Sequence, residues 1–319
     1  MCLSRTPSFI SYSRQAGLGL QEKVTKKAFA NLLCALTPVR ALWKELASNP
    51  REFMEKRRQA KIKRKIAKFW EARNRAYAVH RQPERLSCRL CGYEDAAGKF
   101  EQLHSECLFG AGKLMRYKCL KCGVIFGDLK VLDMTPKQIG RAYEMLYRVY
   151  SEGDSSLAQI EAFYKLSPKK NGKYLNFGCG NSKFAIETLR RMRADGYEVY
   201  GYDPYAKIKD QELVGRGLCL NKRTFSKMEF DGILTHNVLE HLFDPIGVTK
   251  MLLSKLSPGG LLMHSTACFE YVYEFTGFHV FFFTGDSVKH LAERAGAEVQ
   301  IIHKSEMEHM NAGAIFKKK

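Results

Sequence analysis

A glycine turn between a short apolar segment and a predicted helix is the feature that most constrains the fold of this 319-residue chain. Residues 174–177, Tyr-Leu-Asn-Phe, are typical of a buried strand, and Gly178-Cys179-Gly180 follows directly. Because glycine has no Cβ, such a turn bends sharply and lets a ligand approach the backbone closely. From Lys173 onward strand and helix signals alternate. This alternation predicts an α/β domain with a mostly parallel sheet covered on both faces.

The C-terminal region, residues 171–319, is predicted to form a Rossmann-like, doubly wound sheet of seven strands. The expected strands are 174–177, 198–202, 217–220, 231–235, 260–265 and 298–302, with 313–316 as a closing edge strand. Helices are expected near 183–193, 244–256 and 286–296. The sequence therefore predicts one catalytic-sized domain at the C-terminal end.

An acidic residue stands at the end of the second expected strand. Asp203 closes the segment Tyr200-Gly201-Tyr202-Asp203 and lies 23 residues beyond Gly180. This is near the spacing of about 20 residues at which a carboxylate holds the ribose hydroxyls of a nucleotide cofactor. The alternative is that Asp203 only caps the turn at Pro204. The glycine turn and the acid together indicate a cofactor site.

Three further segments narrow the class of the domain. They are Phe230-Asp231-Gly232-Ile233-Leu234, Asn237-Val238-Leu239-Glu240-His241-Leu242 and Leu256-Ser257-Pro258-Gly259-Gly260. Together with the Gly178 and Asp203 segments, they closely resemble class I S-adenosylmethionine-dependent methyltransferases at the fourth strand, the segment after it and the start of the fifth strand. Nicotinamide dehydrogenases share the glycine turn and the acid but have no counterpart of the last two segments. The resemblance favours methyl transfer over hydride transfer.

The resemblance implies roles for individual residues. Gly178 and Gly180 pass under the methionine portion of the cofactor, Asp203 binds its ribose, and Asn237 helps to line the floor of its site. The full implied cofactor-binding set is Asn176, Phe177, Gly178, Cys179, Gly180, Tyr202, Asp203 and Asn237. Family members often carry an acid where Asn176 stands and a third glycine where Ser182 stands. Asn176 still hydrogen-bonds but brings no charge for the cofactor's ammonium group, so reduced affinity or a lost activity is an alternative.

Histidine suits the task of taking a proton from a hydroxyl or amine acceptor at neutral pH. His236 and His241 flank the exit of the fourth expected strand, and His279 lies in the aromatic segment 277–284. In similar sugar and small-molecule methyltransferases this last loop closes over the acceptor, so we expect His279 to be the catalytic base. The alternative is a histidine packed into an aromatic lid. We expect His241 to be structural, since the Glu240-His241 pair recurs in family members with unrelated acceptors.

Four of the ten cysteines form two Cys-x2-Cys pairs, each followed by glycine. Cys88 and Cys91 are separated by 27 residues from Cys119 and Cys122. Two residues between thiolates let both sulfurs reach one ion, and two such pairs complete a tetrahedral Zn²⁺ site with no open position. We therefore predict a zinc ribbon with a structural ion over residues 86–130, in a reducing compartment. A redox dithiol or simply buried cysteines are the alternatives.

Positive charge is concentrated at the N-terminal end. Residues 1–80 hold 18 Lys+Arg and 5 Asp+Glu, a net of +13, and the other 239 residues hold 34 against 28, a net of +6. The segment from Leu18 to about Tyr77 is typical of helix, with a break at Pro38 and a helix start at Asn49-Pro50. We predict a basic helical arm over residues 1–85 and a helical connector or cap over residues 131–170.

Three kinds of partner suit the basic arm. It would dock at an anionic membrane surface or a membrane-bound assembly, where each basic residue adds about 1 kcal/mol. Alternatively, it would bind RNA phosphates with an affinity that falls steeply as the salt concentration rises. A third alternative is a solvated helix that binds a protein. We favour the membrane surface over nucleic acid, because the rest of the chain is nearly balanced in charge.

The acceptor is the least constrained part of the prediction. A methyltransferase with a preceding four-cysteine ribbon resembles enzymes of bacterial cell-surface glycan and glycolipid biosynthesis, and also some ribosomal RNA methyltransferases. We expect methyl transfer to a hydroxyl, amine or carbon of a sugar, glycolipid or related small molecule. RNA is the alternative acceptor, and a non-catalytic homologue that binds a partner is a third alternative. Without a stretch of about 20 apolar residues or a secretory leader, a cytoplasmic protein is expected, peripheral at the inner membrane face if the arm docks there.

Overall fold

The computed structural model of the chain describes residues 49–79, 83–107, 110–150, 153–180, 183–205, 218–269, 276–309 and 312–319. Two compact units, Met1–Lys61 and Ile62–Lys319, make up the chain. Residues 18–48 of the predicted helical segment, with the break at Pro38, lie outside the described residues, and so do Ser182 and Gly217. Within the described ranges, no helix combines the length and apolar character that crossing a membrane requires.

Helix α2 (Pro50–Val79) carries the basic run and continues from the first unit into the second. The side-chain oxygen of Asn49 accepts a hydrogen bond from the Glu52 N–H at 3.2 Å, and Pro50 needs no donor at the first helical position. The predicted helix start at Asn49-Pro50 is confirmed. In the second unit Ile62, Ile66 and Trp70 are buried at four-residue spacing, so one face of the helix packs while most of its charged side chains stay exposed.

The cysteine pairs lie among short antiparallel strands. A two-stranded sheet holds β1 (Arg85–Ser87) and β2 (Glu94–Ala96), and the 3₁₀ turn η1 (Ala97–Lys99) follows it. A four-stranded sheet has the order β10-β5-β4-β3. Its strands are β3 (Glu101–Cys107), β4 (Gly112–Lys118), β5 (Ile125–Gly127) and β10 (Phe281–Phe282). Since β10 comes from the C-terminal region, the cysteine-bearing region and the C-terminal region share one sheet.

The main sheet has six strands within the described residues, in the order β11-β12-β9-β8-β6-β7. They are β6 (Lys173–Phe177), β7 (Glu198–Tyr202), β8 (Phe230–His236), β9 (Leu256–Ser265), β11 (Ala297–Ile302) and β12 (Gly313–Lys318). Strands β7, β6, β8 and β9 run parallel, whereas β12 pairs antiparallel with both β9 and β11. The sheet is therefore mixed, and the predicted α/β class is confirmed.

Two details of the predicted sheet need correction. The segment predicted as strand 217–220 contributes a single parallel bridge between Gly201 and Cys219, so the described residues form six strands and not seven. The C-terminal strand, predicted at the edge, lies inside the sheet between β11 and β9. Its backbone bonds to a neighbour on each side, and Ala314 and Phe316 are fully buried. Periodicity along a strand predicts which face is buried but not the order of the strands.

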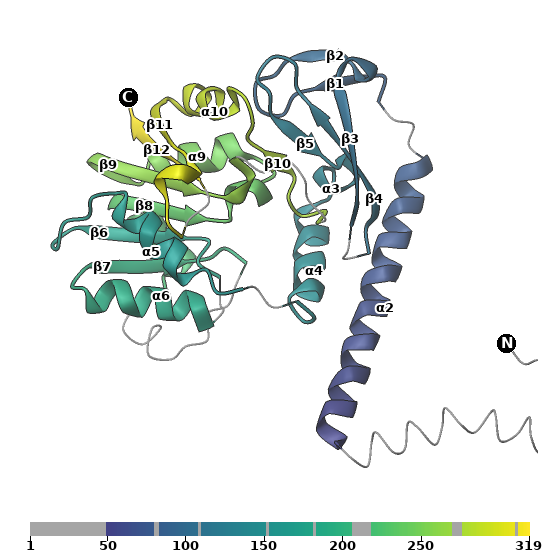
Figure 1. Ribbon diagram of the computed structural model, residues 1–319, viewed down its shortest axis with the longest axis horizontal. Helices are drawn as coiled ribbons and strands as arrows, with labels where there is room; N and C mark the ends of the chain where they lie inside the picture. Colours follow the sequence, from purple (N-terminus) through teal and green to yellow (C-terminus); the bar gives the residue numbers. More distant parts are fainter. Residues whose placement is uncertain are drawn as a thin grey trace, which may run out of the picture. The chain divides into compact units, whose positions relative to one another are not determined.

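Helices cover both faces of the main sheet (Figure 1). Among its described residues, the second unit has after α2 the helices α3 (Leu129–Leu132), α4 (Pro136–Leu146), α5 (Ser156–Tyr164), α6 (Lys183–Ala194), α8 (Lys222–Lys227), α9 (Pro245–Leu253) and α10 (Ser287–Ala295). Short 3₁₀ turns are η2 (Leu239–His241), η3 (Ala267–Phe269) and η4 (Lys304–Glu306). Successive residues of β8 separate the two layers: Ile233 belongs to the core with α9 and α10, and Leu234 to the core with α5 and α6.

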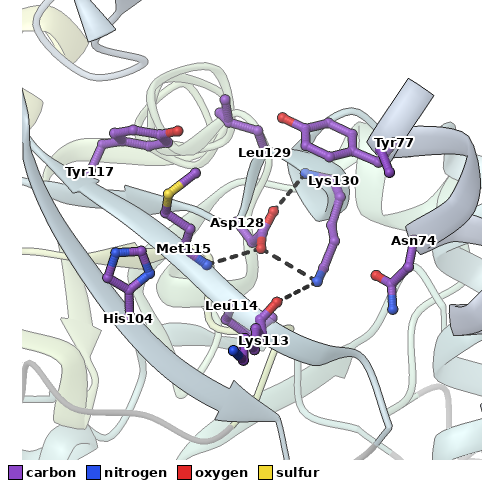
Figure 2. A pocket seen from close by; sticks show the side chains of 11 residues that line it. Asn74, Tyr77, His104, Lys113, Leu114, Met115, Tyr117, Asp128, Leu129 and Lys130 are labelled. Carbon is purple, nitrogen blue, oxygen red and sulfur yellow. Dashed lines mark hydrogen bonds and ion pairs between the residues drawn. The ribbon is translucent and has the colours of Figure 1, made fainter. Parts of the chain in front are cut away.

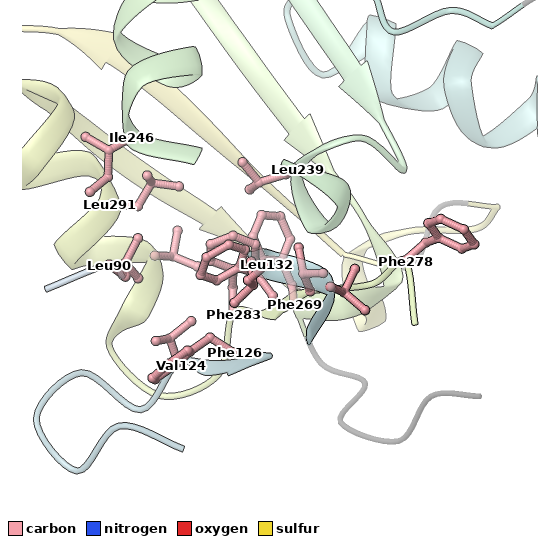
Figure 3. Close-up of a cluster of buried hydrophobic side chains, with 14 of the residues drawn as sticks. Leu90, Val124, Phe126, Leu132, Leu239, Ile246, Phe269, Phe278, Phe283 and Leu291 are labelled. Carbon is pink, nitrogen blue, oxygen red and sulfur yellow. The ribbon is translucent and has the colours of Figure 1, made fainter. Parts of the chain in front are cut away.

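A continuous hydrophobic core joins the cysteine-bearing region to the main sheet (Figure 3). Leu90, which lies between the cysteines of the first pair, and Val124, which lies two residues after the second pair, are fully buried, and so is Phe126 on β5. They belong to the same cluster as Phe283 and Leu291 from the C-terminal region. The two regions therefore fold around shared apolar side chains and not around separate cores.

Candidate active site

The glycine turn lies where β6 ends and is tied to the neighbouring strand. The Gly178 N–H donates to the Tyr202 carbonyl at 2.8 Å, which brings the ends of β6 and β7 together. Both turn glycines have positive φ, +75° at Gly178 and +68° at Gly180, a region that disfavours side chains. A Cβ on Gly178 would lie 2.4 Å from Cγ2 of Val238, whereas a Cβ on Gly180 would meet nothing within 4 Å. The turn is therefore packed on one side and open on the other.

Asp203 faces this turn from the end of β7. Its Oδ2 accepts a hydrogen bond from the Gly180 N–H at 3.0 Å, and its Oδ1 accepts one from the Tyr205 N–H at 2.8 Å. The second bond is the turn cap considered above as the alternative role. The first bond brings the acid to the glycine turn, 23 residues earlier in the chain. Asp203 thus caps its own turn and also bonds to the glycine turn.

Four of the implied cofactor residues have buried side chains, namely Asn176, Phe177, Cys179 and Tyr202. Asn176 is buried, and its amide donates to Gln159 Oε1 at 2.9 Å on α5. The Tyr202 ring stacks on Phe225 at 4.3 Å between centroids, and Phe177 packs in the same aromatic group. Burial raises the pKa of the Cys179 thiol well above its usual value. These side chains build the core under the turn.

Asn237 comes directly after β8, on the same edge of the sheet. It is exposed, adopts a left-handed φ of +52°, and its N–H donates to the Ser265 carbonyl at 2.8 Å. Asparagine tolerates this conformation better than most residues. The sharp turn carries the chain into η2, where Glu240 and His241 lie.

A carboxylate and two imidazoles meet next to this turn. Glu240, His241 and His279 offer ligand atoms that lie within 4.8 Å of one another, and the two histidine rings are 4.6 Å apart between centroids. Glu240 is buried, with only 1% of its surface exposed. Burial raises the pKa of its carboxyl, while His279 opposes this rise. The structure brings His279 and His241, predicted from separate segments, into one cluster around an acid.

His236, the third predicted histidine, lies at the end of β8. Its Nδ1 is 3.0 Å from the Ser265 hydroxyl, and burial lowers its pKa to about 4. His264, on β9, lies between the hydroxyls of Thr235 and Thr249 at 2.7 and 3.2 Å, and burial lowers its pKa to about 3. Both rings are therefore neutral at physiological pH.

The loop that carries His279 is held from two sides. The Val280 N–H donates to the Glu240 carbonyl at 2.9 Å, and the Val280 carbonyl accepts from the Gly127 N–H of β5 at 3.0 Å. Arg116 on β4 is almost fully buried, and its guanidinium donates to the carbonyls of Thr276 and His279 at 2.8 and 3.4 Å. The cysteine-bearing sheet therefore fixes the backbone on both sides of His279.

The four cysteines of the two pairs converge. The Sγ atoms of Cys88 and Cys122 are 3.8 Å apart, and those of Cys91 and Cys119 are 3.6 Å apart. All four sulfurs lie within 4.8 Å of one another. Hydrogen bonding from Cys122 lowers the pKa of Cys88 to about 5, and burial raises that of Cys91 to about 11. Four sulfurs at these separations match the donor set of a tetrahedral ion site.

The two cysteine turns have the same backbone design. In each, the N–H of the glycine after the pair donates to the carbonyl of the first cysteine at 2.9 Å, at Gly92 and at Gly123. Both glycines have positive φ, +75° and +79°. The second turn also packs on the C-terminal region, since the Thr284 hydroxyl donates to the Gly123 carbonyl at 2.5 Å.

A cavity of about 280 Å³ lies beside the C-terminal half of α2 and strand β4 (Figure 2). Asp128 accepts from the backbone N–H groups of Lys130 and Met115 at 2.8 and 3.0 Å, and the Lys130 ammonium lies 3.6 Å from it. Tyr77, Tyr117 and His104 also line the cavity. All lining residues fall between positions 74 and 130, so the cavity is separate from the glycine turn.

Sequence reasoning missed the residues that support the histidines. No sequence pattern indicates a role for Arg116, because the carbonyls to which it donates are 160 and 163 residues away in the chain. Tyr143, whose hydroxyl lies 3.2 Å from His241 Nδ1, was part of a helical pattern and nothing more. Glu240 was visible within the motif but had no role, although an acid among apolar residues beside a histidine was a usable signal.

The comparisons with known proteins agree with this fold. Residues 154–301 match a family model described as a methyltransferase domain. A tRNA U34 carboxymethyltransferase from Helicobacter hepaticus is 30% identical over 134 residues, which cover 37% of this chain and 42% of that protein. The chain thus spans less than half the length of this curated relative.

Solved methyltransferases are similar at low identity. The mitomycin 7-O-methyltransferase MmcR is 16% identical with a TM-score of 0.38, over 59% of this chain and 60% of that one. A methyltransferase from Thermotoga maritima, a possible histamine N-methyltransferase, is 20% identical with a TM-score of 0.37, over 57% of this chain and 98% of that one. Scores this low carry no argument about acceptors. Residues 154–301 are thus similar to a methyltransferase domain, and most of the mixed α/β sheet lies within this range.

Proposed function

We propose that this methyltransferase domain is an active enzyme that transfers the methyl group of S-adenosylmethionine to a hydroxyl, amine or carbon of a sugar, glycolipid or related small molecule. The observation that carries the proposal is the bond from the Gly180 N–H to Asp203, which joins the turn and the acid into one site. The open space at Gly180 supports this reading, because a ligand can approach the backbone there.

The residues present fit the cofactor. The carboxylate of Asp203 would hold the ribose hydroxyls, and the backbone of Gly178 and Gly180 would pass under the methionine portion. When bound, the cofactor supplies an electrophilic methyl group on a sulfonium. Asn176 is committed to Gln159, so it offers no side chain to the cofactor's ammonium group. Because Asn176 bonds to Gln159, we expect a lower affinity for the cofactor than in family members that carry an acid at this position.

The acceptor group would lie at the cluster of Glu240, His241 and His279. His279 is the candidate base for a hydroxyl or amine, since one of its ring nitrogens lies within 4.8 Å of the ligand atoms of Glu240 and His241. His236 is a weaker candidate, because its pKa of about 4 makes it a poor proton acceptor at neutral pH. His241 positions the loop through its bond to the Phe278 carbonyl at 3.0 Å.

Calorimetric titration with S-adenosylmethionine tests the cofactor assignment. Replacing Asp203 with alanine removes charge-assisted hydrogen bonds worth about 1.5–3 kcal/mol, so affinity should fall about 10- to 100-fold. Asp286→Ala, at an exposed acid near α10, is the matched control and should bind as the wild type does. Wild-type affinity in Asp203→Ala, or no binding by the wild type, would remove the enzymatic assignment.

RNA is the second candidate acceptor. The specific observation in its favour is the tRNA U34 carboxymethyltransferase relative, although that likeness covers 37% of this chain. The basic face of α2 suits phosphate contacts, with Lys and Arg dense over residues 56–65. Methyl transfer from labelled cofactor into RNA, with affinity that falls steeply with salt, would favour RNA over a small molecule.

Two further features belong to the same proposal. The four clustered sulfurs support a structural Zn²⁺ held by Cys88, Cys91, Cys119 and Cys122, which orders the cysteine-bearing sheet. The basic arm is suited to an anionic membrane surface or a membrane-bound assembly. Sedimentation with anionic vesicles that is unchanged when residues 1–80 are deleted would count against membrane docking. Elemental analysis that finds no zinc in the purified protein would count against the ion.

A further inference from the structure

The carboxylate of Glu240 is buried and makes no hydrogen bond of good geometry within the described residues. Both of its oxygens are fully covered and have no hydrogen-bonding partner at good geometry within the described part of the chain. A buried carboxylate without compensation costs several kcal/mol, so it is protonated, paired or bound to a cation. The groups that face it include the rings of His279 and His236 and the Thr266 hydroxyl. A cation bound at this place would compensate the ionised carboxylate.

Hydrogen bonding at Nδ1 fixes the tautomer of His241. Its Nδ1 lies 3.0 Å from the Phe278 carbonyl oxygen, which can only accept. The proton of a neutral ring is therefore on Nδ1, and the lone pair is on Nε2. A donor bond from one ring nitrogen to a backbone carbonyl is the arrangement that metal-ligating histidines usually have. Tyr143, 3.2 Å from the same Nδ1, further fixes the ring.

His279 completes the donor set from a separate loop. One of its ring nitrogens lies within 4.8 Å of the Glu240 and His241 ligand atoms. Donors on one transition-metal ion lie about 2.0–2.2 Å from it, so a small closure of the three side chains would bring them into range. The loop itself is fixed by Arg116 and by the bonds of Val280, so the donors are held close before any ion binds.

We propose that Glu240, His241 and His279 bind one divalent transition-metal ion at the acceptor end of the site. Two imidazoles and one carboxylate suit Mn²⁺, Fe²⁺, Co²⁺ or Zn²⁺ and leave coordination positions open. This inference rests on the proposed methyltransferase function, and it assigns the open positions to oxygen or nitrogen atoms of the acceptor. The site is chemically distinct from the four-cysteine cluster, whose thiolates select softer ions and leave no open position.

The ion would replace the base that was assigned to His279. An acceptor hydroxyl bound to a divalent ion loses its proton to solvent more readily, because the ion stabilises the oxyanion. The acceptor oxygen then forms a bond to the methyl carbon while the carbon–sulfur bond breaks and its electron pair stays on sulfur. The products are a methyl ether, a neutral thioether and one released proton. The lone pair of His279 serves the ion, and cannot also take the proton.

Electron paramagnetic resonance with Mn²⁺ tests the site on the full-length protein. Mn²⁺ prefers nitrogen and oxygen donors, so the cysteine cluster does not compete for it. We expect the wild type to bind one Mn²⁺, and Glu240→Gln and His279→Gln to bind it at least about tenfold more weakly. His309→Gln, at an exposed histidine, is the matched control and should bind as the wild type does.

Cofactor titration of the same variants separates this inference from the proposed function. Each variant should keep wild-type affinity for S-adenosylmethionine, which also shows that it has folded. No Mn²⁺ binding by the wild type, or equal binding by wild type and Glu240→Gln, with cofactor binding intact would overturn the metal site and leave the methyltransferase standing. Loss of cofactor binding by the wild type would instead remove the function on which the inference rests. If a glutamine variant is unfolded, Mn²⁺ binding is measured with the conservative variant Glu240→Asp. We expect this variant to bind Mn²⁺ measurably but more weakly than the wild type does.

Discussion

The two halves of the candidate active site are held by different means. On the cofactor side, Gly178 and Gly180 bond to Tyr202 and Asp203 through their own backbone N–H groups, within 24 residues of chain. On the acceptor side, Arg116 reaches Thr276 across 160 residues and Tyr143 reaches His241 across 98. The cofactor side is therefore a property of the main sheet alone, whereas the acceptor side depends on the cysteine-bearing sheet and on α4.

Because of this difference, a change in the cysteine-bearing sheet should affect the acceptor side and leave the cofactor side unchanged. A change in the cysteine-bearing sheet should move the His279 loop, because β5 pairs with β10 and Gly127 bonds to Val280. The glycine turn shares no backbone hydrogen bond with that sheet in the described residues. Binding of cofactor and turnover of acceptor should thus respond separately, and four experiments arranged by expected size test this.

Removal of the proposed zinc ion should have the largest effect. A structural ion of this kind contributes on the order of 10 kcal/mol to folding in small zinc modules. Treatment with a strong chelator should speed amide exchange in residues 112–127 and 276–284, and turnover should be lost. Residues 198–203 should keep their protection, and cofactor affinity should stay within a few-fold. Equal loss of protection in both sets of residues would contradict the division into two halves.

Low pH should lower the free energy of unfolding of the main sheet, and so affect both halves of the site together. His264 lies under β8 and β9, with a pKa lowered by burial to about 3. The unfolded chain binds a proton at this ring below about pH 6.5, and the folded chain does not until about pH 3, so stability falls as pH drops through that window. The slope from this one residue is about 1.4 kcal/mol per pH unit.

Denaturant unfolding at pH 7, 6 and 5 measures this slope. His264→Gln keeps polar atoms near Thr235 and Thr249 but cannot titrate, so its pH dependence should be flatter by that amount. His309→Gln, at an exposed position, should keep the slope of the wild type. An unchanged slope in His264→Gln would show that this histidine does not control the stability of the sheet in acid.

A methyl group on Gly178 should weaken the cofactor side. Its Cβ would lie 2.4 Å from Val238 Cγ2 at a positive φ, so Gly178→Ala should cost about 3 kcal/mol of stability and most of the cofactor affinity. Gly180→Ala meets no neighbour and should cost only about 1 kcal/mol. Adding Val238→Ala to Gly178→Ala should restore part of the loss in thermal unfolding. No recovery in the double variant would mean that backbone strain, not the clash, dominates.

Loss of the Arg116 guanidinium should affect only the acceptor side. Arg116→Met keeps most of the volume but removes the donors to Thr276 and His279, at a cost of about 2 kcal/mol. We expect slower turnover at saturating acceptor with unchanged cofactor affinity. Arg141→Met, on the exposed face of α4, is the control. Weaker cofactor binding in Arg116→Met would break the separation between the two halves.

The same difference decides what the sequence could predict. The glycine turn, Asp203 and the helices around them depend on local spacing, and each was predicted within a few residues of its place. The pairing of Phe281–Phe282 with β5 and the burial of Arg116 depend on contacts between distant segments, which periodicity does not encode. For the same reason the place of β12 was wrong, because the alternation of Ala314 and Phe316 specifies a face but not a neighbour.

The two-residue strand β10 also limits how this protein could be shortened. Phe281 and Phe282 are covered because β5 supplies the adjacent backbone and Phe126 the adjacent ring. A fragment that began after residue 150, to retain the family domain alone, would expose this aromatic strand with unpaired backbone groups. Such an edge recruits other chains, so the isolated domain should form aggregates where the longer chain remains dispersed. The cysteine-bearing sheet therefore protects the C-terminal region from aggregation by covering the edge of β10.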